Sequence, residues 1–285
     1  GDASRIDRPF PFSWRNDDLV YTGTWGLPAC RRLGAWTGEA RREDVSAWLQ
    51  EGTERVVVEA VRHWIGERKA TRLALAGGLF ANVCVNGRLA ALPEVEALHV
   101  FPHMGDGGLA AGAALHVASP LPAPLDSLHL GPGFTEASVE AVLCRAGLCY
   151  TRPADPDGAL LHALLRGEAV VRCIGRMESG PRALGHRSVL APAHDPTVTG
   201  RLNAALCRDD FLPFAPVLPV EEAASAFPHV TEAAGPLRTM TVALPARAAF
   251  AGACPAAVHR DGTSRPQVVH PHDDQVERDR VTNGE

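Results

Sequence analysis

The sequence lacks any uninterrupted apolar run near 18 residues, about the length that a membrane-spanning helix needs. Residues 1–17 are polar and contain no apolar segment typical of a secretory signal peptide. Lys69 is the only lysine among 28 basic residues, only two tyrosines occur, and the net charge is −5 without a basic stripe. Extended nucleic-acid surfaces need clustered cations and stacking aromatics. We therefore expect no membrane partner and no nucleic-acid partner.

The seven cysteines are scattered and odd in number, which favours a reduced, cytoplasmic chain over a disulfide framework. The 285 residues are enough for two domains of about 150 residues each. Hydrophobic residues make up 46% of the chain, an ordinary globular composition. We therefore expect a folded protein of two domains.

The first part of the chain alternates helical and strand patterns. Apolar residues recur at helical spacing from Arg42 to about Gly66, which predicts one long helix with a candidate interruption at Gly52. A buried-strand pattern from residue 72 ends in two glycines, and a helix to Leu92 follows. The same order then repeats: a strand over 98–102, a glycine turn over 103–108 and a small-residue helix to Ala118. This order is typical of an α/β fold, whereas residues 1–42 read as irregular.

Three prolines mark a linker at 119–127, after which the order of elements changes to that of an α+β domain. Asp195-Pro196 predicts the start of a helix that runs to about Cys207. The other predicted helices lie near 136–146 and 160–166, and the predicted strands at 148–152, 169–175, 214–220, 239–244 and 267–270. Residues 275–285 have no periodicity. We therefore divide the chain into domains 1–118 and 128–274, the linker and an atypical tail.

Two glycine turns in the first part are candidates for anion binding. Gly77 and Gly78 follow one strand, and three glycines surround Asp106 after the next strand and before a helix. Free N–H groups at such a turn suit a phosphate, and a carboxylate suits a divalent metal ion. Alternatively, the glycines only make tight turns and Asp106 caps the helix. A structural role is favoured for His103, and incidental solvated residues for the His270-Pro-His272-Asp-Asp274 stretch.

An arginine-rich segment, GRMESGPRALGHRS over residues 175–188, follows an apolar strand in the second part. Glycine turns and converging guanidinium groups would form a cradle for a phosphate or acyl phosphate. The alternative is a solvated loop with surface ion pairs. Neither a catalytic triad motif nor an activated cysteine pair is present, so we expect electrostatic positioning of phosphates rather than covalent catalysis.

Five segments in order resemble signatures of the NodU/CmcH-type O-carbamoyltransferases. They are AGGLFANVCVN (76–86), MGDGGLAAGAA (104–114), GRMESGPRALGHRS (175–188), RDDFLPFAP (208–216) and HRDGTSRPQ (259–267). The resemblance implies an α/β fold: half of an actin-like, TsaD-like ATPase domain, followed by an α+β YrdC-like domain. It also implies transfer of a carbamoyl group from carbamoyl phosphate, through an ATP-dependent carbamoyl adenylate, to a hydroxyl of a sugar or natural-product acceptor.

The resemblance also assigns site residues and cofactors. The cofactors would be ATP with Mg²⁺ and a divalent metal, with Fe²⁺ as one candidate, in the actin-like domain. Arg182, Arg208 and Arg265 match basic catalytic positions that hold carbamoyl phosphate and the ATP phosphates, and Asp106 matches the metal-binding aspartate. The substrate- and nucleotide-binding positions would be Gly77, Gly78, Asn82, Gly107, Gly180, Arg187, Ser188 and Asn203.

Some family features are not apparent in this sequence. A paired-histidine metal motif on a helix is not apparent: before Asp106 the His-x-x-x-His spacing occurs only from His99 to His103, and this pair spans a predicted strand that ends in Pro102. Leu212 stands where many members have arginine. The chain therefore resembles the central half of a carbamoyltransferase. Two alternatives are an inactive fragment or subunit whose complementary half-chain is separate, and a threonylcarbamoyl-tRNA modification factor, which the net charge opposes. An incomplete domain would expose apolar surface and associate.

Overall fold

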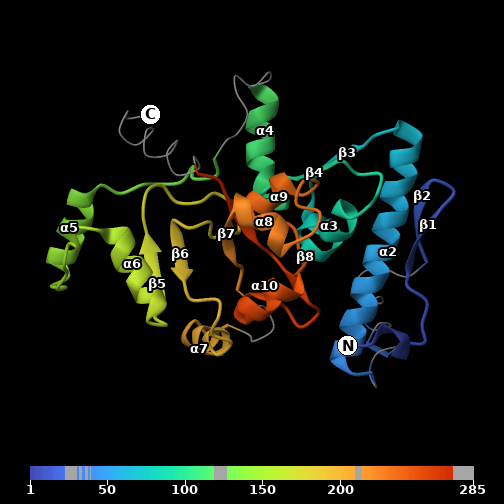
Figure 1. Ribbon diagram of the computed structural model, residues 1–285. Coiled ribbons are helices and arrows are strands. Elements are labelled where there is room, and N and C mark those ends of the chain that lie inside the picture. The colour runs from blue at the N-terminus through green and yellow to red at the C-terminus, as the bar shows by residue number, and fades with distance from the viewer. Residues whose placement is uncertain are drawn as a thin grey trace.

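The computed structural model describes residues 1–22, 31, 34–35, 38, 40–118, 127–208 and 214–271 (Figure 1). Within these ranges it is a mixed α/β protein with five two-stranded sheets. The predicted linker except for its last residue, the predicted tail and His272 to Asp274 lie outside the described residues. None of the described helices is both long and apolar enough to cross a bilayer.

The first part of the chain holds one long helix and two short parallel strands. Its elements are η1 (Ala3–Arg5), β1 (Phe12–Arg15), β2 (Asp18–Tyr21), α2 (Arg42–Arg68), β3 (Arg72–Leu75), η2 (Gly78–Ala81), α3 (Val83–Ala90), β4 (Ala97–Val100), η3 (Asp106–Gly108) and α4 (Leu109–Val117). β3 and β4 are parallel, with Leu73 opposite Leu98, as the predicted α/β order requires. The antiparallel pair β1–β2 lies in a stretch that the sequence predicted to be irregular.

The second part holds short helices and strands in α+β order. Its elements are α5 (Glu136–Arg145), α6 (Pro156–Leu165), β5 (Val170–Cys173), β6 (Arg187–Leu190), α7 (Val198–Ala205), β7 (Val217–Pro219), α8 (Val220–Ala226), α9 (Ala234–Arg238), β8 (Leu244–Pro245), α10 (Ala248–Ala253), η4 (Pro255–Ala257), β9 (Thr263–Ser264) and β10 (Gln267–Val269). β5 and β6 are antiparallel, whereas β7 and β10 are parallel.

Several predicted elements are wrong or shifted. Residues 148–152 form no strand, and of residues 239–244 only Leu244 begins one. α7 begins at Val198 rather than Pro196, because the Asp195 carboxylate accepts from the backbone N–H and hydroxyl of Thr197 and makes a turn before the helix.

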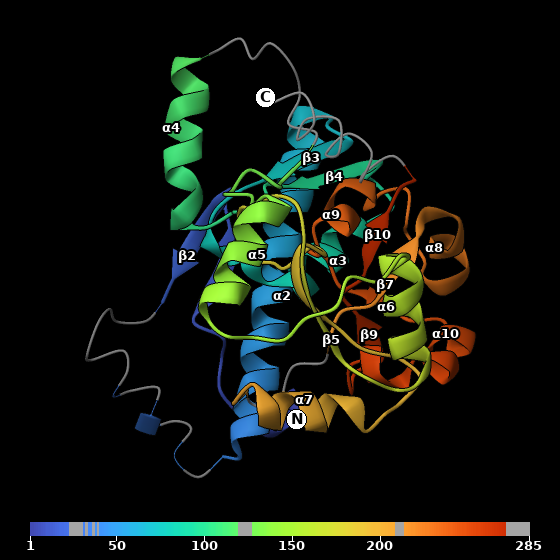
Figure 2. The same cartoon turned by 90° about the vertical axis from the view of Figure 1, so that its left-hand side faces the viewer.

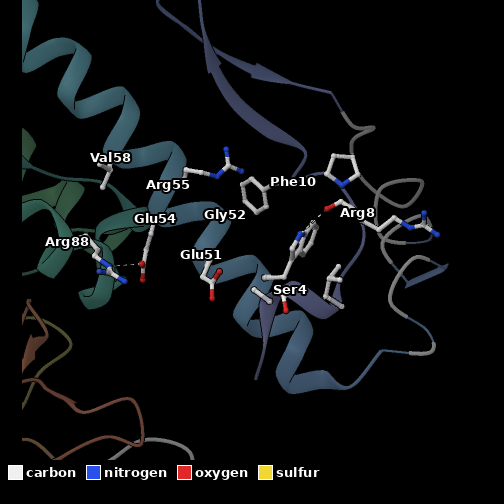
Figure 3. Close-up of a pocket in the computed structure, with 13 residues that line it drawn as sticks. Ser4, Arg8, Phe10, Glu51, Gly52, Glu54, Arg55, Val58 and Arg88 are labelled. Atoms are coloured by element: carbon white, nitrogen blue, oxygen red, sulfur yellow. Dashed lines mark hydrogen bonds and ion pairs between the residues drawn. The ribbon is translucent and has the colours of Figure 1, made fainter.

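The helix α2 runs without interruption through Gly52, so the predicted break there is wrong. The Phe10 ring packs directly against Gly52: an added Cβ on Gly52 would lie 2.2 Å from Cδ2 of Phe10. Phe10 and Trp48 pack edge to face, 5.5 Å between ring centroids, and fasten the N-terminal segment to α2. Phe10, Trp48 and Gly52 line a cavity of about 830 Å³. Figure 3 shows Phe10 and Gly52 beside it.

Asp44 at the start of α2 also holds the N-terminal segment. Its buried carboxylate accepts from the Arg41 guanidinium and from the backbone N–H of Asp2, at 2.7 Å, and lies 3.7 Å from Arg5. The Arg41 hydrogen bond, the Asp2 N–H and the nearby cations lower the pKa of Asp44 from its ordinary 3.8 to about 2.

Because this pKa is lowered in the folded chain, the ionised Asp44 stabilises the segment above pH 3.8, and that contribution disappears as the pH falls toward 2. We expect the protection of residues 2–8 against amide hydrogen exchange, taken relative to the intrinsic rate at each pH, to fall over this interval. An Asp44→Asn variant should exchange rapidly there already at pH 6, while Asp7→Asn, a charge-matched change in the same segment, should behave as the original chain. Equal exchange in the Asp44→Asn variant and the original chain at pH 6 would contradict this role.

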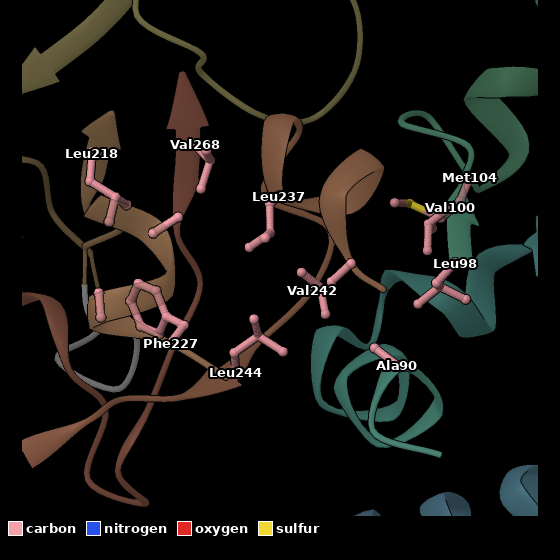
Figure 4. Packing of buried hydrophobic residues seen from close by; sticks show 13 residues of the cluster. Ala90, Leu98, Val100, Met104, Leu218, Phe227, Leu237, Val242, Leu244 and Val268 are labelled. Carbon is pink, nitrogen blue, oxygen red and sulfur yellow. The ribbon is translucent and has the colours of Figure 1, made fainter. Parts of the chain in front are cut away.

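One hydrophobic cluster joins the first part of the chain to residues 214–271 (Figure 4). Ala90, Leu98, Val100 and Met104 pack with residues of the second part, among them Leu218, Phe227, Leu237, Val242, Leu244 and Val268. Backbone bonds cross the same boundary, from Leu98 N–H to Glu232 and from Ala243 N–H to Val83. The side-chain amide of Asn86 donates to the Thr241 carbonyl at 2.7 Å. The core therefore spans the two predicted domains.

The helix α4 exposes apolar side chains, with no residue buried among its nine. Leu109 is 71% exposed and Val117 86%. In both views α4 extends away from the sheets (Figures 1 and 2). This agrees with the expectation of exposed apolar surface, and association of the chain stays a prediction.

Candidate anion-binding site

Two glycine loops meet at the carboxyl ends of the parallel strands β3 and β4. The backbone N–H of Gly77, which has φ +113°, donates to the Met104 carbonyl at 2.7 Å. An added Cβ on Gly105 would lie 4.0 Å from the α-carbon of Gly78. The predicted positions Gly77, Gly78 and Asp106 are thus brought to one edge of the sheet, where α/β folds place their ligand sites.

Local contacts occupy several side chains at this edge. Asn82 caps α3 by accepting from the backbone N–H of Val85 at 3.3 Å, and it exchanges amide hydrogen bonds with Gln50. The His103 ring fills the space beside Gly107, where an added Cβ would be 2.1 Å from its Nε2. This packing agrees with the structural interpretation of His103.

Asp106 is exposed and begins η3. Among the residues that the structure describes, no group of three or more histidine, cysteine, aspartate or glutamate side chains gathers as a metal site would require. The described side chains therefore do not by themselves complete a metal site around Asp106. The assignment of this residue stays a prediction, and we derive no chemical step from a metal there.

The arginine-rich segment forms a loop closed by one buried carboxylate. Glu178 is only 7% exposed and accepts from the backbone N–H groups of Leu184, His186 and Arg187, at 2.8, 2.8 and 3.0 Å. Burial alone would raise the pKa of Glu178, but these backbone donors outweigh it and lower the pKa. The tip of the loop approaches the first part of the chain: an added Cβ on Gly180 would be 3.7 Å from the Pro102 carbonyl.

Three guanidinium groups gather beside this loop. Arg182 lies on the loop, Arg208 follows α7, and Arg265 lies between β9 and β10. Burial, together with the charges of Arg182 and Arg208, lowers the pKa of Arg265 to about 10, and burial also lowers the pKa of Arg182. The Arg208 guanidinium lies over the Phe214 ring, 4.8 Å from its centroid. The structure thus brings together the three arginines that the sequence assigned to phosphate binding.

No carboxylate among the described residues forms an ion pair with any of these three arginines. The Nε atoms of Arg182 and Arg265 are buried and have no hydrogen-bond partner within the described part of the chain. Like charges that are partly buried and unpaired are unfavourable unless an anion joins them. The arrangement is therefore suited to binding an anion with several oxygens, such as a phosphate.

Other predicted site residues hold the loop instead. The Arg187 guanidinium donates to the carbonyls of Ile174 and Gly175 and lies over the Phe134 ring. The Ser188 hydroxyl accepts from the backbone N–H of Gly185 at 2.9 Å. The side chain of Asn203 is buried. The backbone carbonyl of Asn203 accepts from the backbone N–H of Arg208 at 2.8 Å, which positions that arginine.

Two buried polar residues at this site, Glu178 and Gln267, were missed in the sequence. The only signal was a lone glutamate inside an arginine-rich motif and a glutamine in a predicted strand. Nothing local showed that Gln267 would donate to the Leu184 carbonyl, because that contact joins residues 83 positions apart.

Comparison with known protein families decides the affiliation of the chain. The family model described as Carbamoyltransferase N-terminus matches residues 30–115, and the model described as Carbamoyltransferase C-terminus matches residues 161–281. The chain belongs to the carbamoyltransferase family. This family is one of transferases, and the resemblance inferred from the sequence motifs is confirmed.

Individual proteins that are similar to this chain support its place in the carbamoyltransferase family. Nodulation protein NolO of Bradyrhizobium diazoefficiens is 36% identical over 238 residues, 80% of this chain and 43% of the relative. An uncharacterised protein of Methanocaldococcus jannaschii is 33% identical over 254 residues, 85% of this chain and 41% of the relative. The 3'-hydroxymethylcephem-O-carbamoyltransferase of Streptomyces clavuligerus is 31% identical over 193 residues, 64% of this chain and 34% of the relative. The chain thus spans about two fifths of the length of the first two relatives.

Proposed function

We propose that this chain is part of an O-carbamoyltransferase in which Arg182, Arg208 and Arg265 bind carbamoyl phosphate and the phosphates of ATP. The single observation that carries the proposal is the gathering of three guanidinium groups, two of which, Arg182 and Arg265, have a buried Nε atom without a hydrogen-bond partner among the described residues. In the proposed architecture, residues 1–118 form half of an actin-like domain and residues 128–274 a YrdC-like domain. The acceptor would be a hydroxyl-bearing small molecule, and the site of action the cytoplasm.

The proposed reaction uses the arginines as an electrostatic clamp. Water attacks the phosphorus of carbamoyl phosphate, the bond between that phosphorus and the carbamate oxygen breaks, and inorganic phosphate leaves. The freed carbamate oxygen then bonds to the α-phosphorus of ATP, and pyrophosphate leaves. In the second step the acceptor hydroxyl oxygen attacks the carbamoyl carbon, loses its proton, and AMP leaves. Phosphate groups of two substrates repel each other, so three cations beside them lower the cost of bringing the reacting atoms together. Arg182 and Arg265 offer paired donors to phosphate oxygens, and Arg208 is kept in place by Phe214.

Carbamoyl-phosphate-dependent release of pyrophosphate from Mg·ATP tests this function. We expect release by the chain and a loss of at least 100-fold in an Arg182→Ala variant, because a hydrogen-bonded charge on the reacting phosphates contributes about 3 kcal/mol. Arg62→Ala, which removes an exposed arginine on α2, is the control of equal charge. Circular dichroism first confirms that all three proteins are folded. A folded chain that releases nothing would support the alternative of an inactive fragment or a subunit that needs a complementary half-chain.

A further inference from the structure

The arginine loop is held on one side by a single carboxylate. Glu178 collects three backbone N–H groups from Leu184 to Arg187, so both ends of the segment that follows Arg182 converge on one buried side chain. A carboxylate can accept all of these donors, whereas an amide in its place would present an NH₂ group to one of them. Its charge is satisfied by these N–H groups and not by an arginine.

A second buried side chain holds the same loop from the opposite side. Gln267, 6% exposed, donates from Nε2 to the Leu184 carbonyl at 3.1 Å. Gln267 itself belongs to β10, where it pairs with Val217 of β7, and its backbone N–H donates to the Pro216 carbonyl at 2.8 Å. Leu184 is therefore bound through its N–H by Glu178 and through its C=O by Gln267, and its side chain is buried as well.

Two of the clustered arginines lie close in sequence to the hydrogen bond between Gln267 and Leu184. Arg182 is two residues before Leu184, and Arg265 is two residues before Gln267. Both are cations, and the charge of Arg182 lowers the pKa of Arg265, so repulsion between them acts to push the loop away from β10 when no anion lies between them. The bond between Leu184 and Gln267 opposes that separation. Neither Glu178 nor Gln267 neutralises an arginine, so the positive charge stays available to an anion.

We propose that Glu178 and Gln267 are positioning residues that clamp the Leu184 peptide and thereby set the spacing of Arg182 and Arg265 for a phosphate-bearing ligand. This inference rests on the proposed function of the arginine cluster. It adds that the cluster is preorganised by a neutral and an anionic side chain that do not touch the ligand.

Binding of inorganic pyrophosphate, measured by titration calorimetry, tests the clamp without requiring catalysis. We expect the dissociation constant to rise at least 10-fold in Glu178→Gln and in Gln267→Met, and to stay unchanged in the control Arg62→Ala. Thermal unfolding of each variant verifies that it is folded. Should Gln267→Met fail to fold, Gln267→Asn takes its place, since it keeps the amide but shortens the side chain by one methylene group.

A double-mutant cycle separates positioning from general destabilisation. If the clamp acts through Arg182, the Gln267→Met change should alter the dissociation constant by less than 2-fold in an Arg182→Ala background. Equal effects of Gln267→Met in both backgrounds would overturn the clamp. So would unchanged affinity in both single variants while the original chain binds pyrophosphate. A folded original chain that does not bind pyrophosphate would overturn the proposed phosphate site itself, and the clamp with it.

Discussion

Replacing Gly87 with alanine is expected to lower the free energy of unfolding by about 3 kcal/mol, near the upper end for an overpacked site. Gly87 lies on α3 where the helix meets residues 241–243, and an added Cβ would be 2.0 Å from the Ala243 carbonyl oxygen. The obstacle is backbone, which cannot turn aside as a flexible side chain could. The same contact contains the Ala243 N–H bond to Val83 and the Asn86 bond to Thr241.

Urea denaturation measures this effect, and Gly66→Ala is the matched control. Gly66 lies on the exposed surface of α2, with no atom within 4 Å of an added Cβ. Alanine there should stabilise the chain by up to about 1 kcal/mol, because glycine is a poor helix former. Since one hydrophobic cluster spans both parts of the chain, the loss in Gly87→Ala should appear in a single cooperative transition. A Gly87→Ala variant as stable as Gly66→Ala would show that α3 and residues 241–243 do not pack as described.

Replacing Arg265 with methionine is expected to change ligand binding and stability in opposite directions. Loss of a charged donor should raise the dissociation constant for pyrophosphate roughly 10- to 100-fold, equivalent to about 1.5–3 kcal/mol. The free protein should become more stable, because methionine fills a similar volume and removes a cation that burial and two neighbouring arginines disfavour. An increase of about 1 kcal/mol would raise Tm by roughly 2–4 °C for a chain of this size.

The pH dependence follows from the direction of the pKa shift. The fold lowers the pKa of Arg265 from 12.5 to about 10, so the protonated group costs stability at neutral pH, and this cost declines only above pH 10. Thermal unfolding should show Arg265→Met above the original chain at pH 7, with the gap closing above pH 10. Saturating pyrophosphate should reverse the order at pH 7, because it stabilises only the chain that binds it well. A lower Tm of Arg265→Met without ligand would argue against unrelieved repulsion in the cluster.

Much of the fold could be predicted from local patterns. Helical spacing predicted α2, and the strand-then-glycine pattern predicted β3 and β4 with their loops, because a period of apolar residues and a glycine turn depend on neighbours in sequence. One of the failures involves a contact between residues distant in sequence. Gly52 looks like a helix break by propensity, but the Phe10 ring packed against it keeps the position within an intact helix. Residues 148–152 have strand-like composition and form no ladder.

The family of the chain could be inferred without a structure, since its five motifs need only residue identity and order. The resemblance of these motifs also assigned Arg182, Arg208 and Arg265 to phosphate binding, which stays a prediction. The folded chain was needed to show that these three guanidinium groups lie near one another, while Arg187, in the same motif as Arg182, donates to backbone carbonyls. The reason is physical: the three arginines come from a loop, a helix end and a turn between two strands. Their meeting depends on long-range contacts such as Gln267 to Leu184, which no local pattern encodes.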